Sequence, residues 1–498
     1  RRGNLDLVID PKFGQPSYYD VFGEYSIDIA PNVRLSMNAL FADDRVKIVL
    51  ETDPAEREQI VSDTRNAQLW LRLDSDWSRT LASSTVLSMV DYDNARSGSA
   101  DDPEKMIAAV RDDREVRQFG LRQDWIWSPS DRHRMQWGIH VAYGEADYDY
   151  AGSAEYFELQ AMYQDQPPGL TRSLAANPEG SSYALYVSDR WRLSERAMLE
   201  WGLRWDDQTY TDLSSDSQLS PRLSLLYRLA ANTELRISAG RYHQSQALQS
   251  LQIEDGITRF WPAQRADQLI VGLKFLTGND TALRLEAFRK EIRDLRPRFE
   301  NLYDPLGIMP ELQADRVRLD PQKAVAQGVE LSADRSRGPW NWWAAYTWSK
   351  VTDRIDGRDE PRSWDQRHAM QAGVGWRGEA WEFSAAANVH SGWPRTDLEL
   401  LTTGVDADGE PVNVAVPGPR NALGHPTFAS LDLRLSRRFE VPRGSLLGFI
   451  EISNVINRRN TCCIDWDLEE DALGNEVLEY SRDYWMPLLP AIGILWEF

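Results

Sequence analysis

The chain has 498 residues, of which 77 are acidic and 56 basic, so its formal net charge is -21 at pH 7. This acidity argues against a nucleic-acid-binding role, because no basic face is left for a polyanion. No apolar run approaches the ~18 residues that a transmembrane helix needs. The only cysteines, Cys462 and Cys463, are adjacent, which excludes a disulfide framework and a cysteine-based zinc site.

Alternating apolar and polar side chains predict strands along most of the chain, because successive side chains of a strand point to opposite faces. After a short strand at 3–9, the first hairpin is predicted at 17–30 and 33–43, around Pro31-Asn32. We count about 20 strands. The later pairs are 65–74 with 81–92, 116–127 with 133–143, 183–192 with 196–210, 219–229 with 234–242, 268–275 with 281–292, 327–334 with 340–350, 368–376 with 381–390, the hairpin 427–457, and a last strand at 488–498.

Two short helices are predicted inside connections. Asp53-Pro54-Ala55-Glu56 and Asp102-Pro103-Glu104 each place an acid at the N-cap position, proline at the first helical position and another acid in the first turn.

The clearest repeating unit is the hairpin 427–457. One face of its first arm is apolar and the other is polar, and two environments fit that pattern. In a soluble sandwich the apolar face packs on a second sheet, whereas in an outer-membrane barrel it faces lipid and the polar face lines a watery lumen. The apolar face carries Ala429, Leu431, Leu433 and Leu435, and the polar face carries Ser430, Asp432, Arg434 and Ser436.

The lengths of the connections favour the barrel. Tight turns are predicted at 31–32, 128–132, 194–195, 230–233, 278–280 and 338–339, and they alternate with long loops at 44–63, 147–180, 243–266, 293–326, 403–425 and 458–486. Short periplasmic turns and long extracellular loops are typical of outer-membrane barrels, and so are the girdles that Trp, Tyr and Phe can form. We therefore predict an all-β fold, a large antiparallel transmembrane β-barrel.

Several motifs, in order, resemble the barrel domain of TonB-dependent outer-membrane receptors. They are LSPRLS at 219–224 with SAGRYHQ at 238–244, EAFRK at 286–290, QGVEL at 327–331, SWDQRH at 363–368 with SGWP at 391–394, and NVIN at 454–457. Trp496 and Phe498, with Ile492 and Ile494 on the same face, resemble the C-terminal signal that the barrel-assembly machinery binds. Each motif is short, but their shared order covers most of the chain.

The resemblance implies a 22-stranded barrel that encloses an N-terminal plug domain. Residues 1–498 are then expected to be one barrel domain, truncated at its N-terminus and lacking the plug and the first strand pair. The implied function is active uptake of a scarce or bulky ligand (ferric siderophore, cobalamin, haem, oligosaccharide or peptide) across the outer membrane of a Gram-negative bacterium. The implied partners are outer-membrane lipid, the TonB complex through the plug, the barrel-assembly machinery and the ligand.

Three other functions are compatible with parts of the sequence. A passive porin would share the barrel, and it is the main alternative. An outer-membrane protease or lipase would need a catalytic cluster at one rim, but the histidines are scattered and neither a G-x-S-x-G elbow nor a phosphate loop is present. A soluble carbohydrate-binding β-protein has no reason to alternate short and long connections. We therefore expect no enzyme activity, no cofactor and no metal.

The candidate ligand-contacting residues come from strand phase and from one basic loop. The loop candidates, together with Glu300, also fit an ordinary salt-bridged loop. The segment 406–410 is interpreted as the Asp-Gly turn of a hairpin between 398–402 and 411–416 rather than a calcium loop, and Asp365, Arg367 and His368 as a strand–loop junction. The lumen candidates are Arg134, Gln136, His140, Glu200, Arg204, Asp432 and Arg434, and the loop candidates are Arg293, Arg296 and Arg298.

Overall fold

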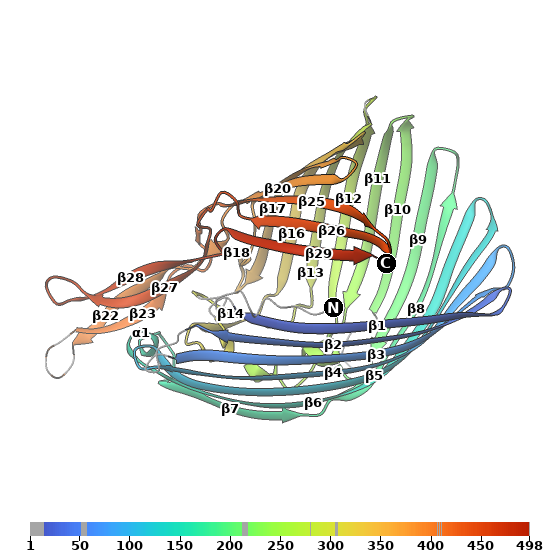
Figure 1. The fold of residues 1–498 in the computed structure, drawn as a ribbon. Coiled ribbons are helices and arrows are strands. Elements are labelled where there is room, and N and C mark those ends of the chain that lie inside the picture. The colour runs from blue at the N-terminus through green and yellow to red at the C-terminus, as the bar shows by residue number, and fades with distance from the viewer. Residues whose placement is uncertain are drawn as a thin grey trace.

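The computed structural model describes residues 14–50, 57–211, 218–278, 280–303, 307–405, 407, 409 and 411–497. One antiparallel sheet of 21 strands forms most of the molecule and curls into a barrel wall (Figure 1). Neighbours in the wall follow one another in chain order, so consecutive strands form hairpins. The predicted all-β barrel is confirmed.

The first part of the wall contains the longest strands. They are β1 (Gln15–Ala30), β2 (Val33–Val49), β3 (Arg57–Asp76), β4 (Leu81–Asp102), β5 (Met106–Ser130), β6 (His133–Tyr156), β7 (Gly169–Ala176), β8 (Glu179–Arg192), β9 (Ala197–Gln208) and β10 (Gln218–Ala230). The second part contains β11 (Thr233–Gln244), β12 (Gln264–Leu276), β13 (Thr281–Arg293), β16 (Lys323–Arg337), β17 (Trp340–Ile355), β18 (Arg358–Pro361), β19 (His368–Arg377), β20 (Trp381–His390), β25 (Phe428–Val441), β26 (Gly444–Ser453) and β29 (Leu489–Glu497).

The connections alternate in length as predicted for most of the chain, but β4 and β5 are joined by a tight turn at 103–105, at the end where long loops were expected. Tight turns occupy 31–32, 77–80, 131–132, 193–196, 231–232, 338–339, 378–380 and 442–443 at one end of the barrel. Longer segments join the strands at the opposite end, among them 245–263, 294–322, 391–427 and 454–488. We call these two ends the turn end and the loop end.

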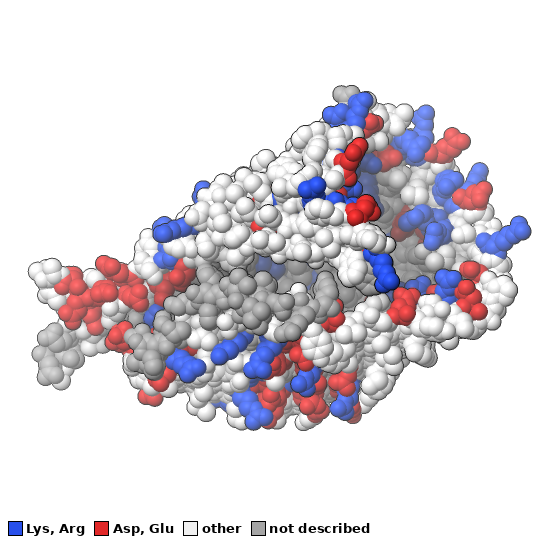
Figure 2. Space-filling view, in the orientation of Figure 1, with Lys and Arg blue, Asp and Glu red and all other residues white. Residues whose placement is uncertain are grey.

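The connections at the loop end contain further small elements. They are the helix α1 (Glu158–Ala161), the 3-10 turns η3 (Leu248–Ser250), η4 (Ile253–Asp255) and η5 (Pro310–Leu312), and the strand pairs β14 (Arg298–Asn301) with β15 (Arg316–Leu319), β21 (Pro394–Arg395) with β24 (Leu423–Gly424), β22 (Leu398–Val405) with β23 (Pro411–Pro417), and β27 (Thr461–Glu470) with β28 (Glu476–Tyr484). The β22–β23 pairing confirms the hairpin predicted around 406–410. Figure 1 shows that β22–β23 and β27–β28 project together beyond the barrel, and Figure 2 shows many acidic side chains there.

The outer face of the wall changes from apolar to charged at one level. Met89, Phe119 and Tyr143 are exposed and lie opposite one another on β4, β5 and β6. At positions two residues further toward the loop end on each strand, the same face carries Asp91, Arg117 and Glu145. The apolar band on the outer face therefore ends at this level. Strands β4 to β6 therefore continue beyond this band, by up to roughly 35 Å of extended chain.

Tryptophans concentrate at the other border of the apolar band, near the turn end. Trp77, Trp125 and Trp137 stack in a row, with ring centroids 5.9 and 6.1 Å apart. Aromatic rings gather at the membrane interfaces of such barrels because one part of the ring is apolar and another is polar. The predicted girdle includes further tryptophans within a few residues of the tight turns, namely Trp127, Trp191, Trp340, Trp376, Trp381 and Trp496.

Three details of the sequence prediction are wrong. The long loop predicted at 44–63 is shorter, because β2 continues to Val49 and β3 begins at Arg57. Residues 147–180 are not one long loop, because β6 continues to Tyr156 and β7 follows. The helix predicted at Asp102-Pro103-Glu104 is a tight turn, in which a carboxylate oxygen of Asp102 accepts hydrogen bonds from the backbone N–H groups of Glu104 and Lys105. A carboxylate that could cap a helix can also accept the backbone hydrogen bonds of a tight turn. Because β4 pairs with β5 up to Asp102 and Met106, only three residues remain between the strands, too few for a helix. Two further predictions, the strand at 3–9 and the helix at 53–56, lie outside the described residues.

The two end strands of the wall each pair on one side. β1 pairs with β2, β29 pairs with β26, and no pairing between described residues joins β1 to β29. Ile492, Ile494 and Trp496 of β29 are well exposed, and Phe498 lies outside the described residues. The truncation proposed from the sequence stays a prediction. Within the described residues, no helix is both long and apolar enough to cross a membrane.

Candidate functional site

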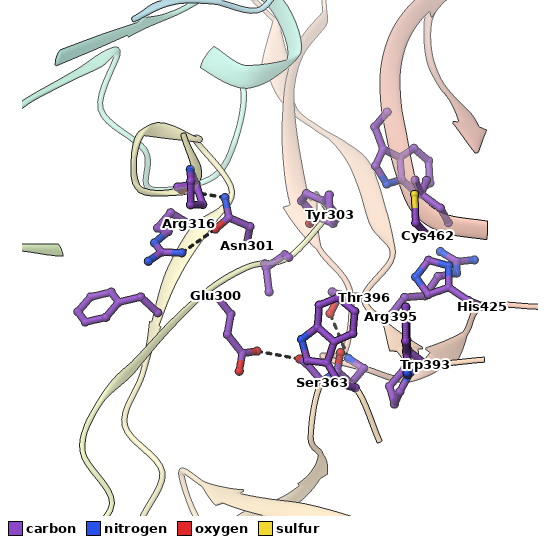
Figure 3. A pocket seen from close by; sticks show the side chains of 18 residues that line it. Glu300, Asn301, Tyr303, Arg316, Ser363, Trp393, Arg395, Thr396, His425 and Cys462 are labelled. Atoms are coloured by element: carbon purple, nitrogen blue, oxygen red, sulfur yellow. Dashed lines mark hydrogen bonds between the residues drawn. The ribbon is translucent and has the colours of Figure 1, made fainter. Parts of the chain in front are cut away.

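The connections at the loop end enclose a cavity of about 220 Å³ (Figure 3). One side is formed by Glu300 and Asn301 of β14 and by Tyr303, which follows that strand. The opposite side is formed by the connection between β18 and β19, by the segment around β21, and by Cys462, Ile464 and Trp466 of β27. Segments more than 150 positions apart in the chain therefore meet around one small space.

A glycine allows two of these segments to approach. A β-carbon on Gly392 would lie 1.7 Å from the carbonyl oxygen of His425, far inside any van der Waals contact. Only glycine fits at this position, just after β20, because any side chain would collide with the backbone of His425. This explains the glycine of the SGWP motif. The neighbouring Trp393 then packs edge-to-face on Trp364, with ring centroids 4.6 Å apart.

Buried ion pairs hold β14, which forms one side of the cavity, against β17. Asp353 is fully buried and accepts hydrogen bonds from Arg298 at 2.6 Å and from Arg362 at 2.6 Å. Glu300 pairs with Arg298 at 3.2 Å and also with Arg420. Buried charges persist only when they are paired, so Arg298 has a structural partner on each side. For Arg298, this is the salt-bridged arrangement that the sequence analysis favoured for the basic loop.

Two polar atoms at the cavity have no hydrogen-bond partner among the described residues. They are the hydroxyl of Tyr303, a residue only 9% exposed, and Nδ1 of His425. Burial, with the nearby carboxylates of Asp315 and Asp397, raises the pKa of Tyr303. Burial, with Arg395 and Arg482, lowers the pKa of His425. Both groups are therefore neutral at pH 7.

A second buried ion cluster attaches two connections to the inner face of β4 to β6. Asp112 on β5 is 1% exposed and pairs with Arg96 at 3.1 Å and with Arg114 at 2.7 Å. Arg96 continues to Glu311 at 2.6 Å, and Arg114 continues to Glu254 at 2.7 Å. Glu254 belongs to the connection 245–263 and Glu311 to 294–322, so both connections are tied to the same wall.

Tyrosines of β6 complete this attachment. The hydroxyl of Tyr148 donates to the carbonyl oxygen of Leu248, and that of Tyr156 donates to the carbonyl oxygen of Leu312 at 2.9 Å. Arg316 then joins the two connections through Asp255 at 2.7 Å. The segment 294–322 thus reaches from β4–β6 to the cavity and forms part of its wall.

The structure brings together only some of the lumen candidates. Gln136, Glu200 and Arg204 line one cavity of about 630 Å³ against the wall strands, together with Arg122, Arg222 and Arg236. Arg134 and His140 are on the same strand as Gln136, at positions two and four residues away. Several of these residues pair with a neighbour: Glu200 with Arg190 at 3.1 Å, and Arg204 with Asp206 at 2.7 Å.

The remaining candidates lie elsewhere. Asp432 of β25 accepts a hydrogen bond from the backbone N–H of Asn454 at 2.8 Å, and Arg434 pairs with Glu451 at 3.2 Å. Arg293 pairs with Glu291 at 2.6 Å, and Arg296 lies between it and Arg298 in the chain. The candidates therefore do not form a single site, and their role in ligand contact stays a prediction.

The junction predicted at Asp365, Arg367 and His368 is confirmed. One carboxylate oxygen of Asp365 accepts a hydrogen bond from the backbone N–H of Val351 at 3.0 Å, and the other pairs with Arg367 at 3.3 Å. Nδ1 of His368 lies 2.7 Å from the hydroxyl of Tyr346. These contacts order the end of β17 and the start of β19.

Sequence reasoning missed the 220 Å³ cavity. Two of its aromatic residues, Trp364 and Trp393, belong to the motifs SWDQRH and SGWP that were noted, but strand phase does not predict how loops pack together. In the described part of the chain, no three His, Cys, Asp or Glu side chains are grouped so that they could hold a metal ion.

Comparison with known proteins gives one family and one fold. The family model described as TonB dependent receptor-like, beta-barrel matches residues 11–455. Three solved structures superpose on 97 to 98% of the chain: the ferric yersiniabactin uptake receptor FyuA from Yersinia pestis (14% identity, TM-score 0.63), the ferripyoverdine receptor of Pseudomonas aeruginosa (11%, 0.61) and the siderophore receptor PiuA from Acinetobacter baumannii (11%, 0.55). The chain spans 70, 66 and 80% of their lengths. No curated protein sequence gives a significant match.

Proposed function

Because this chain belongs to the TonB-dependent receptor-like β-barrel family, we propose that it is the wall of an outer-membrane receptor for the active uptake of a scarce or bulky ligand. The proposal rests on the family match over residues 11–455, and the difference between the two ends of the barrel supports it. One end has tight turns behind a tryptophan girdle, and the other has long, mutually attached connections around a cavity.

The proposed orientation follows from that difference. The tight turns face the periplasm and the loop end faces the medium, as in other outer-membrane barrels. The exposed apolar face between the Trp77–Trp125–Trp137 row and the level of Tyr143 contacts lipid. The acidic β22–β23 and β27–β28 hairpins then stand in water, where their charges are hydrated.

The proposed ligand path starts at the loop end and continues along the polar inner wall. The similar structures carry names that specify ferric yersiniabactin and ferripyoverdine as the ligands of those proteins. A ferric siderophore is therefore the first ligand class to test for this chain. Passage is proposed to need a plug domain and the proton gradient coupled through TonB, as the family resemblance implies.

Uptake by living cells tests this proposal. A deletion strain is compared with the same strain carrying the complete gene, and both receive radiolabelled iron bound to catecholate, hydroxamate or carboxylate siderophores. We expect one siderophore class to give accumulation that needs the gene and falls to the deletion level when a protonophore removes the proton gradient. Gene-dependent uptake that survives the protonophore would contradict active transport and support a passive channel.

A further inference from the structure

We infer that the 220 Å³ cavity binds one flat, uncharged ring that carries a hydrogen-bonding oxygen at its edge, as in an aryl amide or a phenol. This inference rests on the proposed function in one respect, because it takes the ring to be part of the transported ligand. Its site is defined by the side chains around Tyr303, Trp364, Trp393 and His425 (Figure 3).

The size of the cavity sets the size of the group. Cavities of roughly 150 Å³ in protein interiors take up benzene. A space of about 220 Å³ therefore holds a six-membered ring with one or two small substituents. It is too small for a complete multidentate iron chelator, so the ring is one part of a larger molecule.

The walls suit a flat ring. Phe299, Trp364, Trp393 and Trp466 all line the space. Aromatic rings prefer stacked or edge-to-face contacts with one another, and these contacts add to the stabilisation that comes from the buried area. Trp364 and Trp393 already hold an edge-to-face geometry, at an interplanar angle of 68°. A flat ring gains such contacts, whereas a puckered ring of equal volume gains only the burial.

The charges at the cavity are already compensated. Glu300 pairs with Arg298 and Arg420, as described above. Arg316 pairs with Asp255 at 2.7 Å, and Arg395 pairs with Asp397 at 3.1 Å. A charged ring would lose its hydration without gaining an unpaired opposite charge, which is costly. The cavity therefore favours a ring without net charge.

The polar atoms without a partner, on Tyr303 and His425, indicate where the oxygen at the edge of the ring would lie. Nearly all buried polar groups in proteins have a hydrogen-bond partner, so a buried hydroxyl without one marks a place for a ligand atom. Tyr303 holds its hydroxyl proton at neutral pH and donates it to an oxygen of the ring substituent. Nδ1 of the neutral His425 offers a second polar contact beside it.

Binding of small probes to the purified full-length protein in detergent tests the inference. We expect benzamide to bind, as detected by ligand-observed NMR, and to bind more tightly than benzoate, benzylamine or cyclohexanecarboxamide. These comparisons vary charge and flatness at nearly constant size. Absence of benzamide binding, or equal binding of benzoate, overturns the inference.

The variant Tyr303→Phe removes only the hydroxyl. We expect it to weaken benzamide binding about tenfold, which corresponds to about 1.4 kcal/mol, because the bound oxygen loses one hydrogen bond from a buried group. The matched control is Tyr143→Phe, whose hydroxyl donates to Glu179 on the exposed outer face and which should leave binding unchanged. Unchanged binding in Tyr303→Phe would contradict the assigned donor. Because these measurements need no transport, failed uptake with intact probe binding would count against the proposed function alone.

Discussion

Replacing Asp112 by Asn is expected to release the connections 245–263 and 294–322 from the wall of β4 to β6. Asp112 lies between Arg96 and Arg114, and it is 1% exposed. An amide keeps the shape but removes the charge, so two partly buried guanidinium groups lose a shared counter-ion. Loss of one partner from a buried ion cluster costs about 3–5 kcal/mol. Because this cluster joins the two connections to the wall, the substitution should lower the free energy that holds them there.

Hydrogen–deuterium exchange of the protein in detergent measures this release. Backbone amides of 245–263 and 307–322 should exchange faster in Asp112→Asn, while those of the apolar band should not change. The control is the adjacent Asp113→Asn. Asp113 pairs with Arg111 on the exposed outer face, with 37 and 72% of the two side chains accessible, so its loss should cost no more than about 1 kcal/mol. Equal exchange in both variants would contradict the role assigned to the cluster.

Replacing Ile139 by Arg is expected to destabilise the barrel in lipid by about 2–4 kcal/mol, the cost of a cation near the middle of a lipid-facing strand. Ile139 lies midway between Met135 and Tyr143 on the apolar face of β6, and it is 40% exposed. The adjacent His140 belongs to the opposite face. His140→Arg is therefore the matched control, with the same new side chain one position along the strand.

Unfolding by denaturant in lipid vesicles distinguishes the two variants. We expect a lower unfolding midpoint for Ile139→Arg and little change for His140→Arg. If His140→Arg were the more destabilised variant, the assignment of the lipid and lumen faces would be reversed.

The alternation of side chains was enough to predict the barrel, and the reason is visible in β25. Its apolar and polar residues were separated by strand phase alone, and the structure pairs it with β26 in the expected hairpin. The same signal was present in β6 beyond Tyr143, where tyrosine, glycine and alanine alternate with acids. A loop was nevertheless predicted from residue 147 onward, although Tyr148 and Tyr150 are buried there beneath the connections that carry η3 to η5.

The cavity could not be predicted in the same way. Its geometry depends on contacts between segments far apart in the chain, such as Gly392 against the backbone of His425 and Arg420 against Glu300. The sequence pattern left two roles open for Arg298, ligand contact or a loop salt bridge, and favoured the salt bridge. Only the position of the buried Asp353 shows that its charge already has a partner.

The location of the cavity at the cell surface is tested most directly by labelling single cysteines in whole cells. Both native cysteines are buried, so an added cysteine at an exposed site reports its own accessibility. Leu473, 87% exposed in the β27–β28 turn, marks the loop end, and Arg79 in the turn between β3 and β4 marks the turn end. With a bulky, membrane-impermeant maleimide, we expect Leu473→Cys to react in intact cells and Arg79→Cys to react only after the outer membrane is permeabilised. Labelling of Arg79→Cys in intact cells, with Leu473→Cys protected, would contradict the proposed orientation of the receptor.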